Sequence, residues 1–496
     1  MPRLAGAGTA VVKPAHAQQV ALTRRTLTPF GLWVYGAAAS APMVVLAGGI
    51  GTTYATTRVT ALPLAFLLVA GMLAILAVGY TAMARQLGHP AAYYAILAHG
   101  MGRGWGVAGG LVALVAYNAI QSSLYGLFGA TMTAYLGGTW WVWSGIALVV
   151  VGMLGQRAIV LSTRVLAVVL GVSLLIVAVF VLAGLGSPAG GEVSWEGFDA
   201  SGLAITGIGG AVAFGVAAYG GFDAPGSLVE EAIDQRSVSR STIVAVVVLG
   251  GVYAAAAWAM GVAVGPDRIA EEAADPGLPF SVLERAGNWW AALGTVTLVF
   301  AIVTSMLVFH SVVARYVFAM ARERVLPAAL AHTGSTTRVG APRAGSLAQS
   351  TVAALVLVAF ATCGADPIAV MFTWLSTLGA MGLLCLLLAA SVAAMTAPSS
   401  VRGPQAGAWE WRFAPALGVL GGTVLLLLMA SNAGSLLGAA PGSLYPFLLP
   451  AILAGTAVMG GVWAGHLRQS RPEVYTGIGR GTPKTHAVPD SINISI

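Results

Sequence analysis

The sequence contains very few charged residues. Of its 496 residues only 8% are Asp, Glu, Lys or Arg, whereas 58% are hydrophobic. Soluble domains usually carry about a quarter charged residues, so this composition excludes an ordinary soluble protein and indicates a membrane protein. Cysteine is almost absent too. Cys363 and Cys385 lie in or beside apolar stretches and form no CxxC pair, which excludes a disulfide framework.

Motifs for catalysis and cofactor binding are also lacking. The sequence has no HExxH, EF-hand, GxSxG or Walker A pattern. Two glycine-rich segments, 100–104 and 477–481, resemble phosphate loops superficially, but neither follows a predicted strand. We therefore predict no catalytic residue, no metal site, no cofactor and no enzymatic activity. The net charge of +7 comes from basic residues at helix ends and short loops, so we expect no nucleic-acid partner.

The positions of the charges predict membrane-spanning helices. Ten long stretches contain no charged residue, and a helix needs about 20 apolar residues to cross a bilayer. The two longest, 104–156 and 413–467, are divided by turn-rich residues at 137–139 and 440–443, which raises the number of crossings to twelve. The predicted spans are 31–55, 61–86, 105–136, 140–156, 161–185, 204–232, 241–265, 289–321, 345–362, 367–395, 413–433 and 444–466.

Basic residues predict the orientation. If both termini are cytoplasmic, 21 of the 24 Lys and Arg residues lie on that side, and only Arg58, Arg268 and Arg285 lie outside. We therefore predict a multi-pass protein of the cytoplasmic (inner) membrane, with the lipid bilayer as a partner. The cytoplasmic tails are predicted at 1–28 and 468–496, and the second is polar and without expected regular structure.

Two spans contain dense helix-breaking residues. The first holds Ser40-Ala41-Pro42 followed by Gly48-Gly49, and the sixth holds Gly215 and the segment 220–226. Broken helices persist in a bilayer where they line a cavity. Because the two stand five spans apart, they are typical of the leading helices of two inverted repeats, here 29–185 and 204–395. The alternative is that the glycines only allow close helix packing.

A few polar side chains lie within spans. Asp223 is the only acid placed well inside one, and it is either functional or a cap for the following half-helix. Tyr117, Gln121 and Tyr125 share one helical face, which either lines a pathway or holds helices together. His310 either relays protons or is a neutral histidine hydrogen-bonded between helices.

Three groups of residues resemble permeases of the amino acid–polyamine–organocation (APC) superfamily, of the bacterial amino acid permease type. The resemblance covers about residues 30 to 400. The matching segments are Ala218-Tyr219-Gly220-Gly221-Phe222-Asp223-Ala224 with Glu230-Glu231, Phe309-His310 with Arg315-Tyr316 and Arg322-Glu323-Arg324-Val325-Leu326-Pro327, and Ala92-Tyr93-Tyr94-Ala95 with Gly100-Met101-Gly102-Arg103 and Tyr117-Asn118.

This resemblance implies an all-α polytopic fold of the five-plus-five inverted-repeat (LeuT) type. The transporter core would span 29–400, with two extra helices at 401–467. The implied function is secondary active transport of an amino acid or related small amine by alternating access. The alternatives are transport of a polyamine or other organic amine, or a non-transporting membrane sensor.

The resemblance also implies a substrate site between the broken helices, with a substrate carboxylate held by backbone groups within 42–51. Ala217 stands at the position where this family usually has an aromatic gate residue. Gln235 and Ser239 stand where prolines usually follow the pair Glu230-Glu231. The predicted substrate-binding residues are Ser40, Pro42, Gly48, Gly49, Tyr117, Gln121, Ala217, Tyr219, Gly221, Phe222, Asp223 and Trp374.

Ion coupling is left open between sodium, proton and no ion. Sodium-independent relatives carry a lysine in the middle of the fifth span, and this lysine aligns with Ser173. The side chain at this position therefore supplies no permanent positive charge. Thr304 and Ser305 could join exposed carbonyls in holding sodium. Alternatively these hydroxyls bond to carbonyls of their own helix.

Overall fold

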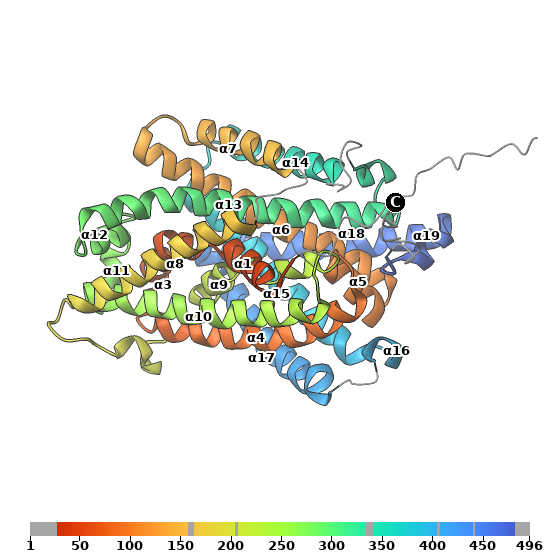
Figure 1. Cartoon of the computed structure of the whole chain (residues 1–496), viewed down its shortest axis with the longest axis horizontal. Helices are drawn as coiled ribbons and strands as arrows, with labels where there is room; N and C mark the ends of the chain where they lie inside the picture. Colours follow the sequence, from red (N-terminus) through yellow and green to blue (C-terminus); the bar gives the residue numbers. More distant parts are fainter. Residues whose placement is uncertain are drawn as a thin grey trace, which may run out of the picture.

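The computed structural model describes residues 27–156, 163–203, 207–333, 342–403, 407–439 and 442–481, and within these ranges the fold is entirely helical (Figure 1). Among the described residues, ten helical segments are long and apolar enough to cross a membrane. Two shorter apolar helices, α7 (Trp140–Gly155) and α9 (Ile208–Ala218), lie at the fourth and sixth predicted positions. Apolar helices therefore occur, in order, at all twelve predicted positions, and ten of them are long enough to be candidate spans.

The two predicted repeats have matching elements. In the first, the segments are α1 (Pro29–Ser40), α2 (Pro42–Val44), the π-helical turn η1 (Val45–Ile50), α3 (Gly51–Thr57), α4 (Leu62–Leu87), α5 (Ala92–Gly100), α6 (Arg103–Leu136), α7 and α8 (Thr163–Gly186). In the second they are α9, η4 (Ala224–Leu228), α10 (Gln235–Val264), α11 (Ile269–Glu272), α12 (Leu278–Glu284), α13 (Asn288–Arg322), η5 (Ala328–Ala331), α14 (Arg343–Thr362), η6 (Pro367–Phe372) and α15 (Thr373–Thr396).

Short helices outside the spans reveal the inverted relation. The α5 helix follows the second span of the first repeat, and α11 and α12 follow the second span of the second repeat. Figure 1 shows α5 at one end of the bundle and α11 and α12 at the other. Equivalent elements therefore lie at opposite ends, as an inverted repeat requires. Of these short helices, α5 lies in the connection between the second and third predicted spans and was not predicted.

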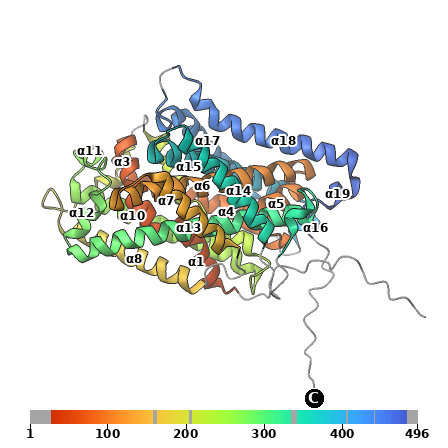
Figure 2. The same ribbon diagram turned by 90° about the horizontal axis from the view of Figure 1, so that it is seen from above.

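The last two spans lie at the periphery. In Figure 2, α18 runs along one edge of the bundle and α8 along the other. Only 28% of the apolar window of each of the last two spans is buried, against 78% for α6. The remaining helices are η2 (Glu196–Phe198), η3 (Ala200–Gly202), α16 (Ser399–Arg402), η7 (Trp409–Phe413), α17 (Ala414–Leu436), η8 (Tyr445–Phe447), α18 (Leu448–Ser470) and α19 (Pro472–Gly477).

The C-terminal region differs from the expectation of an unstructured tail from Arg468 onward. The last span continues to Ser470, and α19 and the turn after it are ordered through Gly481. The other predicted tail residues, 1–26 and 482–496, lie outside the described residues. At the other end of the described chain, the Leu27 amide donates to the Glu231 carbonyl (3.0 Å). We call the end of the bundle that holds Leu27 and Gly481 the terminal face.

The first span is broken at a single residue. Ala41 adopts a left-handed conformation (φ 43°) between α1 and α2. Pro42 explains this position, because proline lacks an amide hydrogen and disfavours a helical conformation in the residue before it. Gly48 and Gly49 lie in the π-helical turn η1, so the chain beyond Pro42 is helical. The interruption is therefore shorter than the segment 42–51, within which the resemblance places the backbone groups for a substrate carboxylate.

The sixth span is broken over a longer segment. After α9 ends at Ala218, residues 219–223 form consecutive turns, and only the 3-10 turn η4 follows before α10. Gly221 has a φ of 90°, which glycine adopts readily and other residues do not. A Cβ added there would lie 2.4 Å from the Ala39 Cβ. The two breaks therefore meet at this glycine, and the expected second half-helix is largely unwound.

Candidate functional site

Hydroxyl groups satisfy the backbone carbonyls that the two breaks release. At the first break, the Ser305 hydroxyl of α13 donates to the Ala39 carbonyl (2.6 Å), and the Tyr253 hydroxyl of α10 donates to the Ser40 carbonyl (3.1 Å). The Ser40 hydroxyl itself lies 3.1 Å from the Gly220 carbonyl. Lipid offers no partner to such groups, so these bonds account for the stability of broken helices inside the bundle.

Asp223 lies at the end of the second break and is surrounded by tyrosines. Its Oδ2 accepts hydrogen bonds from the hydroxyls of Tyr93 (2.8 Å) on α5 and Tyr117 (2.5 Å) on α6. The Tyr80 hydroxyl donates to the Asp223 carbonyl (3.2 Å), and the Tyr316 hydroxyl accepts from the Tyr93 amide (3.1 Å). Two tyrosines thus bond to the carboxylate, one bonds to the Asp223 backbone and one to Tyr93, and Asp223 is 1% exposed.

The second oxygen of this carboxylate, Oδ1, is buried without a hydrogen-bond partner. An unpaired buried acceptor is costly, and it marks a place where a donor from a bound molecule would be stabilised. Asp223 does not cap the helical turn that follows it, since its side chain bonds to no backbone amide there. The capping role considered from the sequence is therefore wrong.

A second polar network joins α6 to α13 and α14. The Gln349 amide group donates to Gln121 Oε1 (2.5 Å) and accepts from Asn118 Nδ2 (2.7 Å). His310 lies with Nδ1 3.4 Å from Gln121 Nε2 and Nε2 2.8 Å from the Ser346 hydroxyl. These contacts fit the interpretation of His310 as a histidine held between helices. They also show that Gln121 bonds mainly to neighbouring spans rather than to the Asp223 group.

The remaining predicted substrate residues fall into different places. Tyr219 and Phe222 are fully buried at the second break, and the Tyr219 hydroxyl donates to the Phe66 carbonyl (2.9 Å). Ala217 is half-buried at the last turn of α9. The ring of Trp374 lies 5.9 Å from that of Tyr445, a residue of η8 before the last span.

The predicted ion-coupling hydroxyls bond to three different carbonyls. Ser173 donates to the Val169 carbonyl (2.8 Å) and Thr304 to the Ala301 carbonyl (3.0 Å), each within its own helix. Only Ser305 reaches another span, at the Ala39 carbonyl. Two of the three hydroxyls thus follow the alternative of bonding to their own helix.

Tyr93, Tyr80 and Tyr316 belong to the site but were not identified from the sequence. Tyr93 and Tyr316 lie in segments that carry the family resemblance, but neither was assigned a role. Tyr80 is an isolated tyrosine in an apolar span. The sequence does offer one indication of Tyr93. Two adjacent tyrosines, Tyr93 and Tyr94, lie shortly before a predicted span, and such a pair is unusual in an exposed loop.

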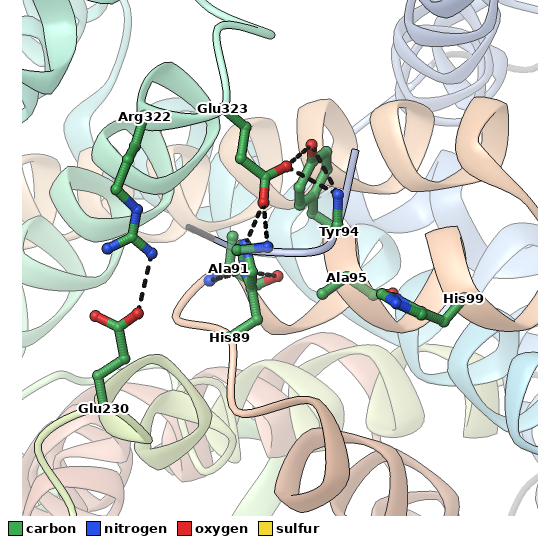
Figure 3. A network of polar contacts seen from close by, with 10 residues as sticks. His89, Ala91, Tyr94, Ala95, His99, Glu230, Arg322 and Glu323 are labelled. Carbon is green, nitrogen blue, oxygen red and sulfur yellow. Dashed lines mark hydrogen bonds and ion pairs between the residues drawn. The ribbon is translucent and has the colours of Figure 1, made fainter. Parts of the chain in front are cut away.

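Ion pairs connect the second break to α13 at the terminal face. Glu231 accepts from Arg315 (2.7 Å), and Glu230 accepts from Arg322 (3.0 Å). Figure 3 shows the second pair beside a group centred on Glu323, the residue directly after the end of α13. These contacts close the terminal face between the second break and α13, and every residue around Asp223 is shielded from solvent in this conformation.

Comparisons with known proteins agree with this architecture. Residues 30–450 match the family model described as amino acid permease. A structure of the Eremococcus coleocola manganese transporter, in complex with an aromatic bis-isothiourea substituted compound, is similar in fold. Its TM-score is 0.56 at 15% identity, and the alignment covers 93% of this chain and 99% of that one.

Two mutant forms of the same transporter give TM-scores of 0.53 at 16% identity, with 90% of this chain and 95% of theirs covered. No curated protein sequence gives a significant match to the chain. The family match spans most of the sequence, and the solved structures share its inverted-repeat architecture. The chain therefore belongs to the amino acid permease family of the APC superfamily and is a multi-pass membrane transporter.

Proposed function

We propose that this protein is a secondary active transporter that carries an amino acid or related small amine by alternating access. The observation that carries the proposal is the buried Asp223 carboxylate, which has one free acceptor oxygen beside two helix breaks. An ammonium group would donate to that oxygen in a charge-assisted hydrogen bond. A substrate carboxylate would be favoured near the start of the helical segment after Ala41, where the helix dipole is positive.

A carboxylate-free organic amine is the second candidate. The charged group at the breaks is an acid, and the hydrogen bonds to its side chain come from tyrosines rather than from a basic residue. Such a site recognises a positively charged group, but it offers no positively charged side chain that would pair with a substrate carboxylate. A divalent metal is less suited, because hard cations prefer several oxygen ligands, and the described residues gather no group of three His, Cys, Asp or Glu.

Asp223 also supports a role for protons. A carboxylate that alternates between a proton and a substrate ammonium would stay neutralised at each stage of the cycle. Ser173 and Thr304 donate their hydroxyl hydrogens within their own helices, which leaves their oxygen lone pairs open to a cation, so the flux experiment in choline decides about sodium. We propose proton coupling or exchange, with the terminal face in the cytoplasm.

Solute flux in proteoliposomes tests this function. The purified full chain should take up at least one labelled amino acid or polyamine, and uptake should persist when sodium is replaced by choline at fixed pH. Loss of uptake in choline would overturn the proton or exchange mechanism. Absence of flux for the whole panel, in protein that remains folded, would favour the sensor.

The proposed orientation has its own test. Both native cysteines are first replaced, and single cysteines are introduced at Ala274, between α11 and α12, and at Ser400 in α16, which are both exposed. An impermeant thiol reagent added to intact cells should label Ala274→Cys and leave Ser400→Cys unlabelled until the cells are opened. The reverse pattern would place the terminal face outside.

A further inference from the structure

The C-terminal segment Pro472–Gly481 is docked on the terminal face. Its apolar residues Val474 and Ile478 are 6% and 2% exposed, and the Tyr475 ring lies 5.5 Å from the guanidinium of Arg103 at the start of α6. Burial of apolar side chains and a cation–π contact are both favourable. The segment is therefore attached by side chains as well as by its backbone.

The backbone of this segment binds one carboxylate. The amides of Gly479 and Gly481 donate to the two oxygens of Glu323, at 2.8 and 2.7 Å. Both glycines have a positive φ, 76° and 71°, and this conformation turns alternate amides toward the same acceptor. A Cβ at Gly479 would lie 2.8 Å from the Ala98 Cβ, so the close approach to α5 also requires glycine.

Glu323 joins the segment to α5. The same carboxylate accepts from His89 Nε2 (3.1 Å) and from the Tyr94 hydroxyl (Figure 3). Burial opposes its ionisation, but the bonds from His89, Tyr94 and Gly479 outweigh burial and hold the pKa of Glu323 below its ordinary value. The carboxylate is thus charged at neutral pH and accepts from three parts of the chain.

Tyr94 and its neighbour Tyr93 connect this contact to the transport site. The Tyr94 hydroxyl binds Glu323, whereas that of Tyr93 binds Asp223. Both tyrosines lie on the same short helix, so α5 is bonded to Glu323 through one residue and to Asp223 through the next. Loss of the Glu323 contact would leave α5 attached to the unwound sixth span by Tyr93 alone among these two tyrosines.

We propose that residues 472–481 form a latch, which holds α5 against the end of α13 and thereby keeps Tyr93 on Asp223 while the terminal face is closed. Opening toward that face then requires α5 to loosen, and the docked segment slows this step. Release of the segment should speed opening. The inference deepens the proposed function, but docking and opening can be measured without knowing the solute.

The test compares Gly479→Ala with Gly477→Ala in the full chain. A Cβ at Gly477 meets no atom within 4 Å, so the second variant is a matched control two residues away. Trypsin cleavage after Arg480, followed by mass spectrometry, reports release, because Ile478 and Gly479 are buried while docked. We expect cleavage about tenfold faster or more in Gly479→Ala, given the energy of charge-assisted bonds, and no change in the control.

Opening is measured with a single cysteine at Ser227, which lies in η4 and is 3% exposed. A small thiol reagent should label Ser227→Cys several-fold faster when combined with Gly479→Ala, and the maximal uptake rate should rise with little change in KM. Glu323→Gln, which keeps the side-chain shape, should act in the same direction. If trypsin cleaves Gly479→Ala and Glu323→Gln no faster than the wild type, the docking of residues 472–481 is not held by these contacts and the proposal fails. If cleavage is faster but the labelling of Ser227→Cys is unchanged, the segment is docked but does not act as a latch. Faster labelling without uptake of any solute would leave the latch standing and contradict the proposed function.

Discussion

Replacing Asp223 with Asn should reduce solute uptake by about ten- to hundredfold, because hydrogen bonds to a charged group contribute roughly 1.5–3 kcal/mol. Asparagine keeps the shape of the side chain and can still accept from Tyr93 or Tyr117, so the fold should survive. It offers no negative charge to an ammonium group and cannot take up a proton in the physiological range. We therefore expect the pH dependence of the remaining uptake to disappear as well.

Asp234→Asn provides the matched control. Asp234 is exposed and caps α10 by accepting from the Arg236 amide (3.0 Å), a role that asparagine also fills. Uptake by this variant should equal that of the wild type. If Asp223→Asn also transports normally with an unchanged pH profile, the carboxylate serves only to bind the tyrosines, and the site must be sought elsewhere.

Gly221→Ala should strongly destabilise the folded protein. The substitution forces alanine into a left-handed conformation, at about 1–2 kcal/mol. It also places a methyl group 2.4 Å from the Ala39 Cβ and 3.0 Å from the Phe309 ring, and overpacking of this kind typically costs about 1–3 kcal/mol. We expect a lower melting temperature in detergent and loss of uptake, because the two breaks can no longer approach each other.

The comparison variant is Gly251→Ala. Gly251 lies in α10 with no atom within 4 Å of an added Cβ, so alanine there should be neutral or slightly stabilising. Equal melting temperatures for the two variants would show that the breaks are not packed through Gly221. A destabilised Gly221→Ala that still transports would show that this close approach is dispensable for the cycle.

The spans and their order could be predicted because a single physical requirement, the exclusion of charge from lipid, acts on every residue of a span. The breaks could be located for a similar reason, since proline and clustered glycine alter the backbone wherever they occur. Even so, Gly48 and Gly49 were expected to widen the first break, whereas the π-helical turn η1 accommodates both of them.

The partners of Asp223 could not be predicted, because they come from helices distant in sequence. Tyr93 is 130 positions away, and Tyr117 is 106. The role of Glu323 was missed for the same reason, since its contacts are with residues 89 and 94 and with residues 479 and 481. Local patterns indicate that a buried acid needs donors, but only the packing of the bundle determines which tyrosines supply them.

The hydroxyl groups at the helix breaks affect how the two broken spans can separate. Each hydroxyl of Ser40, Ser305 and Tyr253 carries one hydrogen on a rotating bond, so it can turn from one acceptor to another without moving its helix. If backbone hydrogen bonds joined the two broken spans instead, several of these bonds would have to break at the same time, as they do when a protein unfolds. Here the contacts can be exchanged one at a time, so a large rearrangement can proceed through small successive steps without leaving many polar groups unpaired.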